Sequence, residues 1–278
     1  MVSIEIARLD MLENNYSGAI KRLEALLEGK HGNEIIEEIH DDLALAYLYP
    51  GKFSVATDHK LKAKQLRAIA NDPIGQGFKL FYIAYYQLGT GKIEEALASY
   101  QQALELAPDV SAINLDIEHL TGLAMVQSGR LLNAAERLRV IGDALRDPEY
   151  KAQIRRFYHL NGELLLKLER PADAIVNFKS AIGVYDHPLY RESLARAYWG
   201  NGNIAAAIDE LEKVIKLTDA RLDVPIHYIK AHYQLGQLYE AQGDTKKARS
   251  WYKRFLDFWD SSDTQLDEIE EARKKVSM

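Results

Sequence analysis

The chain has 278 residues, of which 47% are hydrophobic and 27% charged, and its formal net charge at pH 7 is −6. This acidic balance argues against an extended nucleic-acid interface, which requires a basic face. The absence of cysteine excludes disulfides and thiolate metal sites. No stretch approaches the roughly 20 apolar residues of a membrane-spanning helix, and the first helix is too charged for a signal peptide. The composition therefore predicts a cytoplasmic protein without a membrane or nucleic-acid partner.

A small residue is followed twelve positions later by alanine at seven places along the chain. The pairs are Ala7/Ala19, Ala44/Ala56, Ala84/Ala96, Gly122/Ala134, Gly162/Ala174, Ala195/Ala207 and Gly236/Ala248. A fixed internal distance indicates one helical hairpin rebuilt each time, with small side chains where the two helices approach closely. The step between successive hairpins varies, from 33 residues (162 to 195) to 41 residues (195 to 236). Length changes are therefore expected in the junctions.

In chain order, the repeats are expected at about 1–34, 37–70, 77–110, 115–148, 155–187, 188–221 and 229–262. Proline and glycine mark their boundaries, because proline suits a first helical turn and glycine a left-handed helix end. Prolines occupy five of the six junctions and two hairpin turns: Pro73, Pro108, Pro148, Pro188 and Pro225, then Pro50 and Pro171. Glycines occupy five of the seven hairpin turns: Gly51, Gly91, Gly129, Gly202 and Gly243.

The last segment, 263–278, is expected to form a capping helix. Ser261, Ser262 and Asp263 supply an N-cap region, and the helix is predicted from about Thr264 to Val276. Its apolar stripe consists of Leu266, Ile269, and Ala272 or Arg273. One apolar and one polar face are what the end of a repeat stack requires.

No comparable cap precedes the first repeat, where Ile4, Ile6 and Leu9 are apolar from the start. Either a partner covers this edge or the sequence is one domain of a longer protein, and we favour the second interpretation. The same edge would also allow two copies to associate as a homodimer.

The residues around each pair resemble the tetratricopeptide repeat, whose pattern runs L-G-x2-Y, then A-x3-F, then Pro. The best match is Leu235, Gly236, Tyr239, Ala248 and Tyr252. The pattern is broken at Asp10 and Asn14 in the first repeat, and at Lys60 and Leu138, where the family prefers an aromatic ring. The resemblance implies an all-α, right-handed superhelical solenoid of seven helix-turn-helix repeats with a C-terminal capping helix. The stretch 252–259 also looks like the final repeat of helical modules in bacterial signalling and regulatory proteins.

In that family the first helix of each hairpin lines a concave groove. The residues expected there are Phe78, Phe81, Tyr82, Tyr85, His119, Arg156, His159, Arg196, Trp199, Lys230 and Tyr233. With Glu38, Asp41 and Asp42 before them, they predict an acidic beginning, an aromatic middle and a basic end. An extended peptide with an aromatic anchor and acidic residues would complement the middle and end. The competing interpretation places Phe78 and Phe81 in the core.

No pattern in the sequence predicts catalysis, a cofactor or a metal. The stretch 88–92 has glycines and a lysine but lacks the first glycine and the Ser or Thr of a phosphate loop, so a hairpin turn is predicted. His119 and His159 occupy equivalent positions on adjacent repeats and are interpreted as hydrogen-bonding residues rather than metal ligands. The carboxylates at 38, 41 and 42 are interpreted as a solvated acidic face.

The predicted function is a non-enzymatic scaffold that binds a peptide or a partner segment in the groove. The alternative is a regulatory module acting in cis on a missing N-terminal catalytic or DNA-binding domain, or self-associating through its first repeat. The sequence leaves both open.

Overall fold

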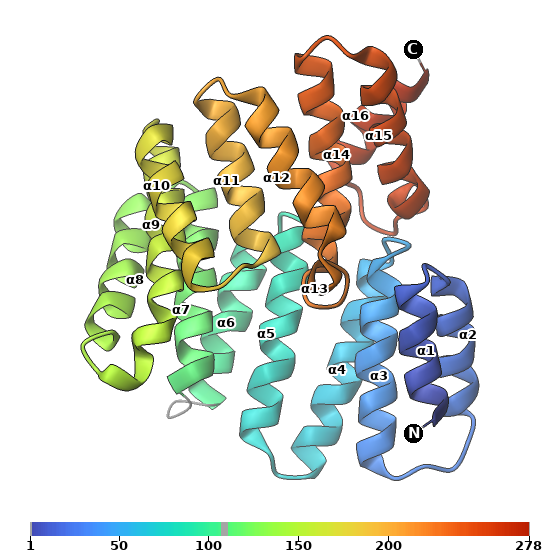
Figure 1. Ribbon diagram of the computed structural model, residues 1–278. Helices are drawn as coiled ribbons and strands as arrows, with labels where there is room; N and C mark the ends of the chain where they lie inside the picture. The colour runs from blue at the N-terminus through green and yellow to red at the C-terminus, as the bar shows by residue number, and fades with distance from the viewer. Residues whose placement is uncertain (1, 107–110, 278) are drawn as a thin grey trace. The chain divides into compact units, whose positions relative to one another are not determined.

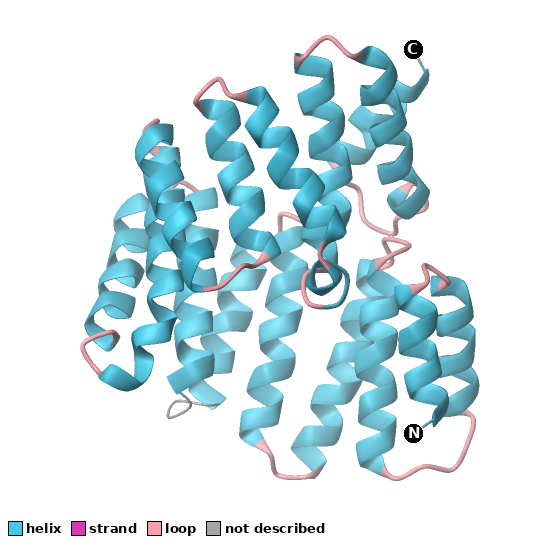
Figure 2. Cartoon of the chain, viewed as in Figure 1, coloured by secondary structure: helices cyan, strands magenta, loops and turns pink. Residues whose placement is uncertain are grey.

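The computed structural model describes residues 2–106 and 111–277, and within them every regular element is a helix (Figures 1 and 2). The first six helices are α1 (Val2–Leu12), α2 (Tyr16–Leu27), α3 (Asn33–Leu48), α4 (Phe53–Ile69), α5 (Pro73–Gly89) and α6 (Ile93–Leu106). The next are α7 (Ser111–Gln127), α8 (Leu131–Ala144), the 3-10 helix η1 (Pro148–Gln153), α9 (Ile154–Lys167), α10 (Pro171–Val184), α11 (Pro188–Gly200) and α12 (Ile204–Lys216). The last are α13 (Thr218–Leu222), α14 (Pro225–Ala241), α15 (Thr245–Trp259) and α16 (Asp267–Ser277). The prediction of an all-α fold is confirmed.

The helices pair into hairpins at the places that the small-residue spacing predicts. Six hairpins are α1/α2, α3/α4, α5/α6, α7/α8, α9/α10 and α11/α12. The seventh is α14/α15, where Tyr252 packs on Gly236 and donates a hydrogen bond to Glu240. The alanine at the second position of every pair is buried, with at most 3% of its surface exposed, at Ala248. At Gly162, an added Cβ atom would lie 2.5 Å from the Phe178 ring, so glycine is required by the close approach of α9 and α10. Short η1 and α13 fill two junctions, which is where length variation was expected.

The hairpin turns use a left-handed residue throughout. The five predicted glycines have φ between +71° and +86°, and Asn14 (φ 64°) and Glu169 (φ 57°) take that role in the remaining two turns. Prolines begin α5, η1, α10, α11 and α14, as predicted, whereas Pro108 lies outside the described residues.

The chain divides into two compact units. Unit 1 contains Met1–Ala107 and Lys253–Met278, and unit 2 contains Pro108–Tyr252. Unit 1 is therefore built from both ends of the sequence, while unit 2 is one continuous stretch.

The C-terminal segment of unit 1 is anchored on the turn between α3 and α4. The Trp259 indole is fully buried, donates a hydrogen bond from Nε1 to the Leu48 carbonyl oxygen at 3.0 Å, and meets the Phe53 ring edge-on at 5.1 Å. The Ser262 hydroxyl donates to the Gly51 carbonyl at 3.0 Å. The side chain of the N-cap residue of α4, Lys52, does not cap the helix, and the Asp263 carboxylate accepts the Ser54 backbone N–H at 3.1 Å instead. Residues more than 200 positions apart thus close unit 1.

The capping helix α16 begins at Asp267, three residues later than predicted. Its stripe of Leu266, Ile269 and Ala272 is buried, which resolves the choice between Ala272 and Arg273. Arg273 instead pairs with Asp260 at the end of α15, at 2.8 Å.

At the other end of the sequence, one of the three residues expected on the exposed edge is not there. Ile4 is 1% exposed and belongs to the core of the first hairpin, whereas Ile6 and Leu9 are 37% and 57% exposed. The correction follows from helix geometry, because Ile4 lies on the same side of α1 as Ala7 and Met11, which face α2.

Candidate binding surface on the first helices

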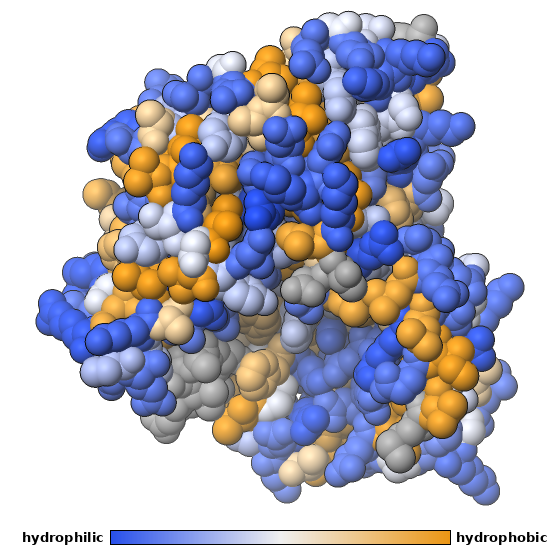
Figure 3. Space-filling model, in the orientation of Figure 1, coloured by the Kyte–Doolittle hydropathy of each residue, from blue (hydrophilic) through white to orange (hydrophobic). Residues whose placement is uncertain are grey.

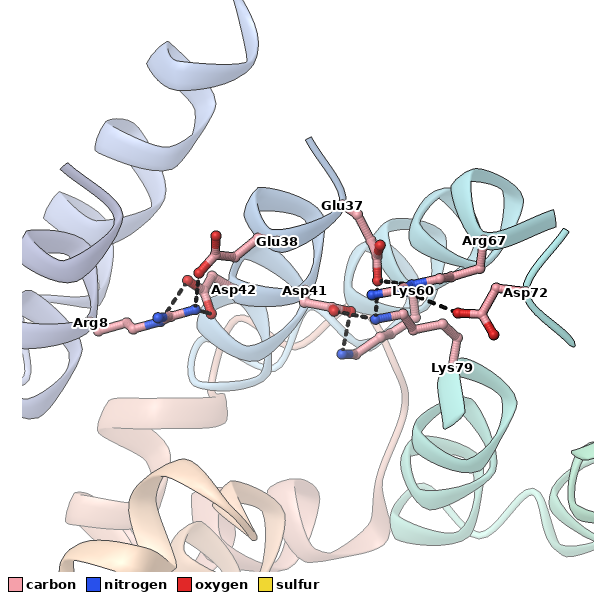
Figure 4. Close-up of polar contacts among 9 residues, drawn as sticks. All are labelled: Arg8, Glu37, Glu38, Asp41, Asp42, Lys60, Arg67, Asp72 and Lys79. Carbon is pink, nitrogen blue, oxygen red and sulfur yellow. Dashed lines mark hydrogen bonds and ion pairs between the residues drawn. The ribbon is translucent and has the colours of Figure 1, made fainter. Parts of the chain in front are cut away.

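Helix α3 carries two pairs of carboxylates that point to opposite sides (Figure 4). Glu38 and Asp42 each lie 2.9 Å from the Arg8 guanidinium of α1. Glu37 and Asp41 turn the other way, toward cations from α4 and α5. The spacing explains the arrangement, since residues four apart share one face of a helix. The predicted acidic beginning of the groove is therefore paired within the molecule, and Asp42 is buried rather than solvated.

Two buried lysines neutralise the second carboxylate pair. Lys60 Nζ lies 2.7 Å from Asp41, and Lys79 Nζ lies 2.7 Å from Glu37 and also contacts Asp41. Only 6% of Lys60 and 8% of Lys79 is exposed. Arg67 closes the group by binding Glu37 at 2.7 Å. We call this set, with Asp72 beyond Arg67, the α3 network, and its members are Arg8, Glu37, Glu38, Asp41, Asp42, Lys60, Arg67, Asp72 and Lys79 (Figure 4).

The pKa values within the α3 network differ from one carboxylate to the next. Burial raises the pKa of Asp42 to about 6, because the single Arg8 guanidinium does not offset its desolvation. Burial also acts to raise the pKa of Asp41, but Lys60 and Lys79 outweigh it and the net shift is downward. Asp41 is thus held ionised, whereas Asp42 takes up a proton at a pH near 6.

The predicted aromatic middle divides into exposed and buried rings. Phe78 and Tyr82 lie one helical turn apart on α5, 43% and 40% exposed. Phe81 is half-buried and meets Tyr82 edge-on at 5.4 Å between ring centroids. Tyr85 is 8% exposed and belongs to the core. The Lys60 ammonium sits 4.5 Å from the Tyr82 ring centroid and holds that ring in place.

The two predicted arginines of unit 2 are bound to carboxylates of neighbouring first helices. Arg156 on α9 donates from Nε to Asp116 on α7 at 2.6 Å, and it is 8% exposed. Arg196 on α11 forms an ion pair with Glu163 on α9. On α11, Glu192 binds His227 and accepts a hydrogen bond from Gln234 at 2.7 Å, both from α14. These pairs join α7, α9, α11 and α14 in sequence and neutralise the two arginines.

His119 and His159 meet, as their equivalent positions suggested. His119 Nε2 lies 2.7 Å from His159 Nδ1, and His159 Nε2 lies 2.8 Å from the Ser193 hydroxyl. Ser193 donates its own proton to the Leu189 carbonyl, so its oxygen accepts from His159 Nε2–H and both rings are neutral tautomers. Burial lowers the pKa of both histidines well below its usual value, and His119, Arg156 and Arg196 add to that effect. We call His119, His159 and Ser193 the histidine line. All three side chains are at most 3% exposed, so the histidine line is buried.

Unit 1 contains a second histidine pair that the sequence did not single out. His40 and His59 bring their Nδ1 atoms to 2.9 Å. Burial lowers the pKa of both, that of His59 to about 4. Among the described residues, no three His, Asp or Glu side chains are grouped to hold a metal ion.

The remaining predicted residues lie in unit 2. Trp199 on α11 is 38% exposed, Lys230 on α14 is half-buried, and Tyr233 is 7% exposed with its ring 5.6 Å from that of Tyr252. The residues missed by sequence reasoning are mostly ion-pair or hydrogen-bond partners of the predicted ones: Lys79, Asp116, Glu192 and Ser193. Lys60 could have been found, because a lysine in a family aromatic position signals a local charge partner.

Comparison with known proteins agrees with this architecture. Tetratricopeptide-repeat models match residues 159–221, and also 81–110 and 229–258. A crystal structure of a tetratricopeptide repeat protein from Parabacteroides merdae is 18% identical, with a TM-score of 0.54 over 99% of this chain and 98% of that one. No curated protein sequence matches the chain.

Two further solved structures share the fold. The Rap conjugation gene regulator of plasmid pLS20, in complex with the Phr* peptide, is 17% identical, with a TM-score of 0.62 over 98% of this chain and 74% of that one. Yeast Tom70 is 14% identical, with a TM-score of 0.55 over 95% of this chain and 58% of that one.

Repeated hairpins whose first helices contact one another define a helical-repeat protein. The family matches and the shared fold identify the repeat, and the chain is a tetratricopeptide-repeat protein. In the described residues, none of the helices combines the length and apolarity needed to cross a bilayer.

Proposed function

We propose that the chain is a non-enzymatic scaffold that binds a peptide or partner segment on its first helices, with the exposed rings of Phe78 and Tyr82 as anchors. One observation carries the proposal: these two rings are exposed on α5 while the charged side chains beside them, Asp41, Lys60 and Lys79, neutralise one another. Aromatic anchors surrounded by satisfied polar groups are typical of interaction hot spots.

The charge pairing changes the expected ligand. The predicted peptide carries acidic residues beside its aromatic anchor, which would meet the basic residues of the groove. Two of these, Arg156 and Arg196, are bound by Asp116 and Glu163 instead. Releasing either arginine would leave a buried or half-buried carboxylate unpaired, which costs more than the new contact returns. We therefore expect recognition through an aromatic or aliphatic anchor in the ligand, with only a modest dependence on salt.

One structure with the same fold supports a peptide-binding role for this chain. The Rap regulator was solved in complex with the Phr* peptide, and it has the highest TM-score of the structures compared above. That peptide belongs to the regulator, and the ligand of this chain is defined here only by the chemistry of the α5 rings.

The experiment is affinity capture from the source cell, with identification by mass spectrometry, using wild type and Phe78→Ala/Tyr82→Ala. Both side chains are exposed, so the fold is retained and helicity serves as the check. Leu132→Ala is the matched control, since this side chain is 89% exposed on the second helix α8. The proposal expects a protein that wild type and Leu132→Ala both retain and the double variant loses, and the captured protein then yields a peptide for affinity measurement.

Equal recovery of every partner by the double variant would contradict the proposal. Arg196→Glu is unsuitable for this purpose, because the new carboxylate would face Glu163 and Glu192 and would disturb the joining of α9 and α11. Trp199→Ala is a better probe of unit 2, since its ring is exposed.

A further inference from the structure

The exposed residues of helix α5 form a single apolar row. They are Pro73, Ile74, Phe78 and Tyr82, and none of them is charged. Ile74, Phe78 and Tyr82 follow one another at intervals of four residues and are 44%, 43% and 40% exposed. We call these three residues the α5 row. Figure 3 shows hydrophobic residues over the lower half of α5. Because a helix rises about 1.5 Å per residue, the side chains of the row are about 6 Å apart and form one ridge.

The charged side chains beside the α5 row are engaged in ion pairs, and this bears on the form of the ligand. Lys79 binds Glu37 at 2.7 Å, and Asp72, just before α5, binds Arg67 at 2.9 Å. An extended peptide gains affinity mainly from hydrogen bonds to its main chain, and these ion-paired groups do not offer them. A helix satisfies its own main-chain groups and packs an apolar stripe on a ridge of this kind. The α5 row therefore suits a helical ligand better than an extended one.

Two contacts show which residues of α4 lie beside the α5 row. The two helices are consecutive and antiparallel (Figure 1). In one contact, the Lys60 ammonium lies 4.5 Å from the centroid of the Tyr82 ring. In the other, a Cβ atom added at Gly75 would lie 2.6 Å from Cδ of Arg67. The residues of α4 and α5 between these contacts therefore lie level with each other in reverse order.

This register places Lys64 of α4 level with Phe78 of α5. Lys64 is four residues from Lys60, as Phe78 is four residues from Tyr82. Lys64 is also three residues from Arg67, and residues three and four apart share one side of a helix. Lys64 thus lies on the side of α4 from which Lys60 and Arg67 contact α5.

The charge of Lys64 is not neutralised by any described residue. It is half-buried and forms neither an ion pair nor a hydrogen bond with the part of the chain that the structure describes. By contrast, the cations that α4 and α5 contribute to the α3 network each have a carboxylate partner (Figure 4): Lys60, Arg67 and Lys79. A partly buried ammonium without a counter-ion attracts a carboxylate. Lys64 therefore selects an acidic residue in a ligand that covers Phe78.

We propose that the segment bound at the α5 row is an amphipathic helix of a partner protein, with an aspartate or glutamate beside its apolar stripe that pairs with Lys64. This inference rests on the proposed function and adds the form of the ligand and one residue that selects it. The stripe, at i, i+4 and i+7, packs on Ile74, Phe78 and Tyr82. A second copy of the chain docking α5 on α5 cannot supply the acidic residue, because the exposed residues of α5 include no carboxylate.

The test is selection from two phage-displayed peptide libraries. Both contain peptides about 16 residues long, since shorter helices are marginal in water. One library is built on a helix-forming scaffold, and the other carries a central proline that prevents a continuous helix. Wild type is the target, with counter-selection against Phe78→Ala/Tyr82→Ala. We expect ligands from the helical library, with Asp or Glu enriched at one position beside the apolar stripe.

The role of Lys64 is tested by repeating the selection on charge-reversed variants. Lys64→Glu should replace the enriched Asp or Glu by Lys or Arg. Lys62→Glu is the matched control, because Lys62 is exposed on the same helix but lies on the side away from Lys60 and Lys64, and it should leave the acidic preference unchanged. Circular dichroism confirms that each variant retains its helicity.

Fluorescence anisotropy then measures the pair directly. The best selected peptide should bind Lys64→Gln about fivefold more weakly than wild type. The same peptide with its acidic residue changed to the amide should bind wild type and Lys64→Gln equally, since the partner of Lys64 is then missing.

The inference and the proposed function fail in different ways. Peptides that depend on Phe78 and Tyr82 but lack the acidic preference, keep it on Lys64→Glu, or come from the proline library would overturn the inference and leave the proposed function standing. Absence of any peptide that depends on the two rings would overturn both. A dimer of the wild type in sedimentation velocity that Phe78→Ala/Tyr82→Ala abolishes would make the occupant a second copy and would also overturn the inference.

Discussion

The two units repeat one hairpin but stabilise it with different chemistry. Unit 1 is closed by a segment from the far end of the sequence and links its first helices through the charged α3 network. Unit 2 is a continuous stretch whose first helices are joined by the buried histidine line and by single ion pairs. The small-residue spacing specifies the hairpin in both, while the polar residues between first helices vary freely as long as they are mutually satisfied. The units should therefore fail under different perturbations.

The largest effect is expected from the anchor that closes unit 1. Trp259→Ala removes a fully buried indole and its hydrogen bond to Leu48, so it should lower the free energy of unfolding by about 3 to 5 kcal/mol. Trp199→Ala, the same change at a 38% exposed position in unit 2, should cost less than about 1 kcal/mol. Urea unfolding followed by circular dichroism measures both. Similar losses at the two sites would show that the C-terminal segment does not support unit 1.

The next effect concerns the α3 network. Asp41→Ala leaves Lys60 and Lys79 buried side by side with less compensation, and we expect a loss of about 2 to 4 kcal/mol. Glu136→Ala is the control, because it breaks only the exposed ion pair with Arg139 and should leave stability nearly unchanged. A loss at Asp41 as small as that at Glu136 would mean that the network contributes nothing to the fold.

The smallest effect is the difference in acid sensitivity between the units. The pKa values of His119 and His159 are lowered by burial, and that of His187 to about 4. A depressed histidine pKa means that the unfolded chain, titrating near 6.5, takes up protons before the folded one. The stability of unit 2 is therefore complete above pH 6.5 and falls as the pH decreases below it.

In unit 1, two contributions to the pH dependence of stability oppose each other. His40 and His59 act as the histidines of unit 2 do, whereas the raised pKa of Asp42, about 6, favours the folded state at acid pH, and this contribution is lost as the pH rises through 6. Amide hydrogen exchange is measured at pH 7 and at pH 5. The protection of backbone amides should decrease more in α7, α9 and α11 than in α3 and α5. The reverse order would contradict the assignment of neutral histidines to unit 2.

Much of the fold could be predicted because it depends on local spacing. The Ala7/Ala19 type of pair, the turn glycines and the prolines are each fixed by a backbone requirement within one hairpin, and a single sequence displays them. The apolar stripe of α16 was predictable for the same reason.

The candidate site could be predicted only in part. The position of each residue in its repeat showed which residues lie on the first helices. It also correctly predicted that His119 and His159 are neighbours. It did not show that Arg156 meets Asp116, since that pairing depends on the step of 40 residues between two repeats and on side-chain direction. The anchoring of Trp259 on Leu48 was also beyond local reasoning, because no periodicity connects residues more than 200 positions apart.

Photo-crosslinking can show whether ligands bind at the exposed rings of α5. A benzoylphenylalanine replaces Tyr82 in one protein and Leu132 in another, and both are irradiated in source-cell lysate. We expect a discrete partner crosslinked from position 82 and absent from position 132, with the crosslink mapping to an aromatic or aliphatic segment of the partner. Partners crosslinked equally from both positions, or from position 132 alone, would contradict binding at these rings.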